Sequence, residues 1–260
     1  MVQKRFKRIY IPYELFLVLL AVVYITMGLT FNVTNWLTCL LGVQGAVVGV
    51  LGADHTWFIS VILLCYLITP IISRLWSKLA NESNFKKTLL IITLFFGKAI
   101  FAFLPHSSFS TILSPLCFYS IAYFLGREFK GINIDLKTII ISLCIIFISF
   151  ITRIATKFIC DGTILYDRII VGYTQIIASA ALFVIFIWLF KNSKPNKLVE
   201  FINSISFEIY LCHYMFVVGP VSLMHITHNL FINGLITTVV SIIIALFLHK
   251  ASDKIILKLK

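Results

Sequence analysis

The sequence predicts an all-α protein in which about eight helices cross a lipid bilayer. Hydrophobic residues make up 60% of the 260 positions and charged residues only 12%, whereas a soluble domain has roughly 45–50% and about 25%. The apolar residues are gathered in runs close to the roughly 20 residues that a spanning helix needs. No stretch has the composition of a soluble domain, so residues 1–260 are expected to form a single membrane domain.

The charge of the chain supports this fold class. The formal net charge is +12, with 22 lysines and arginines, and most of these lie in short segments between the apolar runs. This pattern indicates membrane topology and contact with anionic headgroups, so a nucleic-acid partner is not expected. The six cysteines show no CxxC spacing and lie within or beside apolar runs. They read as small hydrophobic residues, and no metal site is expected.

The expected spans begin with a first helix that is retained in the mature protein. A basic segment precedes the first apolar run and so resembles a signal peptide, but the run approaches spanning length and lacks a small-x-small cleavage site. Pro70 near the end of the second span and Pro115 in the fourth fit helix ends or kinks. The eight expected spans are 13–31, 57–75, 88–104, 109–126, 136–152, 169–190, 201–224 and 230–248.

Residues 32–53 lie between the first two spans and contain no lysine or arginine. Four glycines, Gly42, Gly45, Gly49 and Gly52, interrupt the segment. It reads equally well as a loop or as a short helix that enters the membrane from the outer side.

The distribution of positive charge predicts that both termini are cytoplasmic. Lysines and arginines occur in the N-terminal segment, in the second, fourth and sixth connections and at the C-terminus, while the first and third connections have none. The positive-inside rule then places the charged connections on the cytoplasmic side. The fifth connection is an exception, with Arg153, Lys157 and Arg168 partly offset by Asp161 and Asp167.

The seventh span contains the most unusual polar groups. Glu208, Tyr210 and His213 lie in an otherwise apolar run, and an ionisable group at membrane depth is by default a functional-site candidate. Ser206, Tyr210 and His213 share one helical face, whereas Glu208 lies roughly 160° from His213 at about 100° per residue. Glu208 and His213 are therefore not expected to pair.

Other groups could serve Glu208. Lys98 in the third span and Arg153 at the end of the fifth are possible partners, and the sequence does not choose between them. The remaining histidines are expected to be solvated at the membrane interfaces: His106, His225, His228 and His249.

Three stretches together resemble one protein family. Residues 4–13 (KRFKRIYIPY) are similar to its basic Arg-x-x-Arg segment, and residues 55–61 (HTWFISV) to its His-x-Trp-Phe helix. Residues 206–213 (SFEIYLCH) are similar to its Ser-Tyr-Gly-Ile-Tyr-Leu-x-His segment, with Phe207 and Glu208 in place of Tyr and Gly. The chain thus resembles the acyltransferase-3 family, membrane enzymes that move short acyl groups onto sugars of cell-envelope glycans.

The resemblance and the chemistry of the side chains suggest roles for several residues. Acyl transfer to a hydroxyl needs a base, and His213 and Glu208 are the catalytic candidates. Arginine binds phosphate in a bidentate manner, so the basic segment is a candidate site for acyl-CoA, and the His-x-Trp-Phe helix implies a channel for the acceptor or acyl group. Structural roles remain open as alternatives: the basic segment could be a topology anchor, Trp57 part of the aromatic belt at the membrane interface, and the polar groups of the seventh span a clamp between helices. The candidate binding residues are Lys4, Arg5 and Arg8 for acyl-CoA, and His55, Trp57 and Tyr210 for the acceptor or acyl group.

We therefore expect an integral-membrane O-acyltransferase of the bacterial inner membrane. Its donor would be acetyl-CoA or another acyl-CoA, used as a substrate with no bound cofactor. Its acceptor would be a sugar hydroxyl of a cell-surface polysaccharide or lipid-linked glycan. The alternative is a glycolipid or polysaccharide transporter, or a noncatalytic membrane subunit; few intramembrane charges and no evident paired halves give a transporter little support.

One family motif has no counterpart here. The family carries an Arg-x10-His motif, with a histidine held to be central to catalysis, in helices that precede the basic segment, and no position of this chain matches it. Three interpretations follow: the sequence is a truncated product, the protein is a remnant without activity, or another residue has taken over the role.

Overall fold

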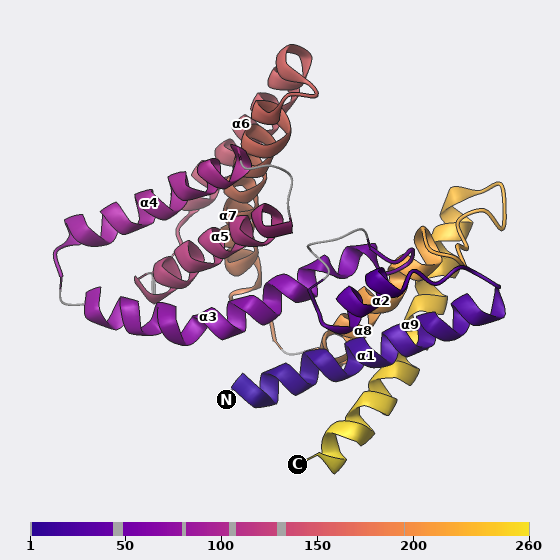
Figure 1. Cartoon of the computed structure of the whole chain (residues 1–260). Helices are drawn as coiled ribbons and strands as arrows, with labels where there is room; N and C mark the ends of the chain where they lie inside the picture. The colour runs from indigo at the N-terminus through magenta and orange to yellow at the C-terminus, as the bar shows by residue number, and fades with distance from the viewer. Residues whose placement is uncertain are drawn as a thin grey trace. The chain divides into compact units, whose positions relative to one another are not determined.

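In the computed structural model, the described residues are 2–43, 49–79, 82–103, 108–128, 134–194 and 196–259, and within them all strands are absent and helices dominate. Figure 1 shows the helices along the chain. They are α1 (Val2–Thr26), α2 (Val33–Leu40), the 3-10 turn η2 (Asp54–Thr56), α3 (Trp57–Leu79), α4 (Asn84–Phe103), α5 (Ser108–Glu128), α6 (Leu136–Cys160), the π-helix η3 (Leu165–Ile170), α7 (Val171–Phe190), α8 (Lys197–Val217) and α9 (Leu230–Lys258).

Within the part of the chain that the structure describes, five helical segments are long and apolar enough to cross a bilayer. They are Phe6–Thr26, Asp54–Leu79, Leu136–Cys160, Leu165–Phe190 and Leu230–Lys258. The long helices α4 and α8 are not among these candidate spans because they are less apolar. α4 carries three lysines, and α8 carries Glu200 and Glu208. The chain is therefore a multi-pass helical protein with five candidate spans, while eight spans with cytoplasmic termini remain a prediction.

Several helix boundaries differ from the expected ones. The first helix ends at Thr26 rather than residue 31 because Gly28 takes a left-handed conformation with φ 65°. The Gly28 N–H donates to the Ile25 carbonyl and the Leu29 N–H to the Tyr24 carbonyl, which is the Schellman pattern of a helix end. The fifth expected span, in contrast, continues from 152 to Cys160 and the eighth from 248 to Lys258, since no glycine or proline interrupts them.

The seventh expected span ends early, at Val217 rather than residue 224. Gly219 and Pro220 follow, and proline cannot continue a helix. Gly219 also lies against Gly52, which has φ 93°; a β-carbon on Gly219 would lie 3.0 Å from the Gly52 Cα. Only glycine allows so close a contact, so the end of α8 and the segment before α3 touch through their backbones.

The chain divides into two compact units, each described by itself. The terminal unit contains α1, α2, α3 up to Leu75, α8 and α9, and the central unit contains α4, α6, η3, α7 and most of α5. In the terminal unit α1, α8 and α9 pack on one another, and in the central unit α6 packs along α7.

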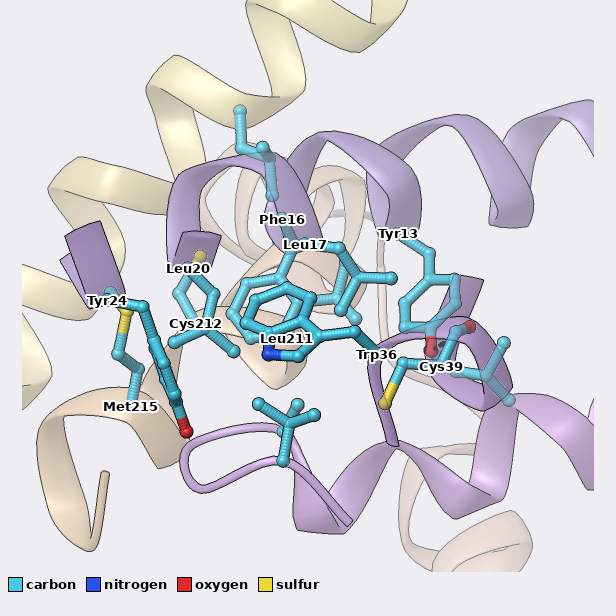
Figure 2. Packing of buried hydrophobic residues seen from close by; sticks show 14 of the residues in the cluster. Tyr13, Phe16, Leu17, Leu20, Tyr24, Trp36, Cys39, Leu211, Cys212 and Met215 are labelled. Atoms are coloured by element: carbon cyan, nitrogen blue, oxygen red, sulfur yellow. Dashed lines mark hydrogen bonds between the residues drawn. The ribbon is translucent and has the colours of Figure 1, made fainter. Parts of the chain in front are cut away.

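The core of the terminal unit is built around α1. Its apolar face meets α8 on one side and the short helix α2 on another, as Figure 2 shows. α2 resolves the open reading of residues 32–53, part of which forms a helix capped by the Asn32 side chain. The labelled residues of the core are Tyr13, Phe16, Leu17, Leu20, Tyr24, Trp36, Cys39, Leu211, Cys212 and Met215.

Three tyrosine hydroxyls of α1 hold the following segment in place. Tyr10 donates to the Leu40 carbonyl, Tyr13 to the Cys39 carbonyl at 2.8 Å and Tyr24 to the Leu51 carbonyl at 3.1 Å. A buried carbonyl without a partner is costly. The tyrosines therefore hold the last turn of α2, and Leu51 shortly before His55, against α1.

The central unit contains a buried lysine. Lys98 on α4 is 5% exposed and its Nζ donates to the Arg168 carbonyl of η3 at 3.0 Å. The ammonium also lies over the rings of Tyr173, 4.2 Å from the centroid, and Phe118, at 5.6 Å. Gly172 provides the space, since a β-carbon there would lie 2.1 Å from the Lys98 Nζ. Lys98 is thus satisfied within its own unit.

Candidate functional site

Two histidines and a tyrosine form a polar cluster in the terminal unit. His55 belongs to the turn η2 just before α3, and Tyr210 belongs to α8. The Tyr210 hydroxyl donates to the His55 carbonyl at 2.6 Å, and the His55 Nε2 lies 2.9 Å from the Tyr210 carbonyl oxygen. This reciprocal pair fixes the start of α3 to α8.

His213 joins the cluster through the same carbonyl. Its Nδ1 lies 2.7 Å from the Tyr210 oxygen and 3.3 Å from the Ile209 oxygen. A carbonyl oxygen only accepts, so this pattern assigns a proton to His213 Nδ1 and to His55 Nε2. In the neutral rings, His213 Nε2 and His55 Nδ1 are then left with lone pairs.

The surroundings of the two imidazoles are aromatic. The ring centroids of His55 and His213 are 5.3 Å apart, and His55 stacks on Tyr214 at 4.7 Å. Phe16 meets the edge of His55 at 6.3 Å. His55 Nδ1 is buried and has no hydrogen-bond partner among the described residues. This lone pair is shielded from any substrate, so of the two imidazoles the partly exposed His213 is the one that can accept a proton from a bound hydroxyl.

Trp57 and Ser206 lie outside this cluster. Trp57 is 44% exposed and its ring contacts Phe58, with centroids 6.2 Å apart. The Ser206 hydroxyl is exposed and donates to the Asn203 carbonyl of its own helix. Of the expected acceptor-binding residues, the structure therefore brings together His55 and Tyr210, but not Trp57.

Glu208 has a different partner from any that the sequence analysis named. Glu208 is 4% exposed, and its Oε1 lies 2.9 Å from Nδ1 of His249 on α9. The sequence analysis named Lys98 and Arg153 as possible partners and did not name His249, and its expectation that His249 is simply solvated is wrong. Glu208 Oε2 is buried and has no hydrogen-bond partner within the described ranges.

His249 bridges two carboxylates. Its Nε2 lies 3.4 Å from Asp253 Oδ2, one helical turn further along α9, and the Asp253 side chain is 59% exposed. The hydrogen bond of His249 is the one with Glu208, while Asp253 lies within ion-pair distance on the solvent side. The spacing of His249 and Asp253 at i and i+4 is the signal that could have predicted the cluster, since such residues face the same neighbour.

The basic segment is only partly described. The side chains of Lys4 and Arg5 lie outside the described part of the chain, and Arg8 is exposed on α1. Lys7, which the sequence analysis did not select, donates from Nζ to the Leu259 carbonyl at 2.9 Å. This bond places the start of α1 beside the end of α9.

The helices and the cluster define a class, that of multi-pass helical membrane proteins with a histidine pair at a helix contact. The acyltransferase-3 family model, described as an acyltransferase domain, matches residues 1–250. The chain belongs to this family, and membrane acyltransferase activity is the activity that the family indicates. No curated protein matches the chain, and no solved structure does.

Proposed function

We propose that the protein is an integral-membrane O-acyltransferase that moves an acetyl or other short acyl group from acyl-CoA to a sugar hydroxyl. The acceptor is a cell-surface polysaccharide or lipid-linked glycan, and the enzyme lies in the bacterial inner membrane with eight spans and cytoplasmic termini. The family supports the acyltransferase class. The observation that carries the site assignment is the Tyr210 carbonyl, which accepts from both His55 and His213.

This shared carbonyl gives His213 its role. With its proton on Nδ1, His213 holds an Nε2 lone pair that takes the proton of the acceptor hydroxyl as the oxygen attacks the thioester carbonyl. The carbon–sulfur bond then breaks, and the CoA thiolate takes up that same proton from His213, so the imidazole returns to its neutral form and the transfer is balanced without any further reactant.

Glu208 contributes in another way. It lies on a different face of α8 and contacts His249, so we assign it a positioning role in place of direct action with His213. His55 and Tyr210 position His213 through their mutual hydrogen bonds. Trp57 is proposed to contact the acyl or acceptor group, and the basic segment is proposed to contact the acyl-CoA.

The test is acyl transfer by the purified full chain from labelled acetyl-CoA to membrane glycan. His213→Ala should lower the rate by about 100-fold or more, the typical contribution of a general base. His225→Ala, which removes an exposed histidine of the same unit, is the matched control and should leave the rate unchanged. Thermal unfolding of both variants shows that each is folded.

Two outcomes oppose the proposal. Transfer that survives His213→Ala removes this residue as the base. If the unaltered chain transfers no acyl group to any membrane glycan, the enzyme assignment itself is wrong and a noncatalytic membrane role takes its place.

A further inference from the structure

The end of α9 carries a row of lysines that the proposed mechanism does not use. Lys250, Lys254 and Lys258 follow one another at i, i+4 and i+8, so they share a helical face and extend over about 12 Å at 1.5 Å per residue. All three are exposed. Like charges at this spacing repel one another and destabilise a helix.

The helix dipole accounts for only part of this row. Cations in the last turn of a helix are stabilised by its unpaired carbonyls, but this effect falls off within that turn. Lys258 lies in the last turn, and Lys7 donates to the Leu259 carbonyl there. Lys250 and Lys254 lie further back, so their repulsion has no such compensation.

Neighbouring charges enlarge the positive patch. The Lys7 bond to the end of α9 brings the basic start of α1 to the same place, with Arg8 exposed beside it; the ends marked N and C in Figure 1 belong to this one unit. Asp253, the acidic residue of this helix end, faces His249. In the part of the chain that the structure describes, no carboxylate forms an ion pair with Arg8, Lys250 or Lys254.

We propose that this patch, formed by Lys7, Arg8, Lys250, Lys254 and Lys258, binds the phosphate groups of the acyl-CoA donor. The inference rests on the proposed function and extends the donor site from α1 to α9. The CoA moiety carries several phosphate charges spread along its length, and a row of ammonium groups with an arginine offers both point charges and a bidentate contact. Bound phosphates would offset the repulsion between the lysine ammonium groups of α9.

The experiment compares two donors. Acetyl-CoA and acetyl-pantetheine carry the same thioester, but acetyl-pantetheine lacks the phosphates. For the full chain with Lys250→Gln and Lys254→Gln, we expect the KM for acetyl-CoA to rise roughly fivefold to thirtyfold, the effect of two surface charge contacts. The KM for acetyl-pantetheine should not change. The difference between donors should shrink at high salt, because exposed charges are screened.

A matched variant controls for net charge. Lys191→Gln with Lys194→Gln also removes two exposed lysines, both in the central unit, and should leave the KM for both donors unchanged. An unchanged KM for acetyl-CoA in the α9 variant overturns the inference, and so does an equal rise for both donors.

Direct binding separates this inference from the proposed function. Titration calorimetry with CoA and with pantetheine needs no turnover: weaker CoA binding by the α9 variant supports the patch even if the chain transfers no acyl group. The measurement is made in nanodiscs of phosphatidylcholine, with and without phosphatidylglycerol. If the α9 variant loses binding of the anionic lipid but binds CoA as before, the patch is a headgroup site and the inference is wrong.

Discussion

Asn233 offers the sharpest test of how the loop between α8 and α9 is held. This residue in the first turns of α9 is 2% exposed. Its Oδ1 accepts from the Thr227 N–H at 3.0 Å and the Thr227 hydroxyl at 2.7 Å, and its Nδ2 donates to the Met224 and Thr227 carbonyls, each at 2.8 Å. One amide thus satisfies four groups of the loop, and Asn233→Ala removes all of these bonds.

The expected loss of stability follows from this count. A hydrogen bond contributes about 0.5–1.5 kcal/mol net to stability. Because Thr227 is half-buried, water can replace some of the partners that it loses in Asn233→Ala. The loss for the four hydrogen bonds together is therefore roughly 2–4 kcal/mol. Asn233→Asp keeps the acceptor but turns a second oxygen toward two carbonyls, so it should cost as much. Asn229→Ala, which removes only the cap of α9, should cost about 1 kcal/mol.

Thermal unfolding of the purified chain measures these differences. Asn233→Ala should lower Tm by about 5–10 °C, and Asn229→Ala by less than half of that. The reasoning is refuted if Asn233→Ala melts with the unaltered protein, or if Asn233→Asp is as stable as the parent, because then the amide donors do not hold the loop.

Three further predictions concern buried or capping groups. Gly172→Ala should destabilise the central unit by about 1–3 kcal/mol by displacing the Lys98 ammonium. In a double-mutant unfolding series, most of this penalty should disappear when Gly172→Ala is made in the Lys98→Met protein. An equal penalty in the unaltered protein and in Lys98→Met would contradict the prediction. His249→Ala should cost about 3–5 kcal/mol because it leaves the buried Glu208 carboxylate unpaired, whereas Glu208→Gln should cost clearly less, and the reverse order in chemical unfolding would count against the pairing. Hydrogen bonds at the start of α6 lower the pKa of Asp135 below its ordinary value of 3.8, so its capping contribution is complete above that pH and is lost as the pH falls through the lowered value. The protection factors for amide exchange in the first turn of α6 should fall on acidification in the parent but not in Asp135→Asn; identical profiles would disprove the capping role.

Helix existence could be predicted from the sequence, but some helix ends could not. Apolar runs of spanning length identify the long helices that the structure describes. The reason is that the length and composition of such a run can be read from consecutive residues. The ends depend on backbone conformation, as at Gly28, and on contacts between distant segments, as between Gly52 and Gly219. Run length alone carries neither kind of information.

The candidate site was predictable to a similar degree. Helical geometry alone separated Glu208 from His213, and the structure shows them with different partners. The partner of Glu208 was not found, since pairing between helices depends on how α8 and α9 pack, and charge alone favoured Lys98 or Arg153 over His249. The meeting of His55 with Tyr210 spans 155 positions of the chain, and only the family resemblance linked these residues beforehand.

The contact of Gly52 with Gly219 has a mechanical consequence. Because backbone contacts backbone with no side chain between them, the segment that leads to His55 and the end of α8 can hardly move closer together. The 5.3 Å distance between the centroids of His55 and His213 therefore depends on a backbone contact that lies outside the rings themselves. A β-carbon on Gly52 would lie 2.9 Å from the Pro220 Cδ, so a larger residue there would push the two segments apart, and with them the rings, without altering either imidazole.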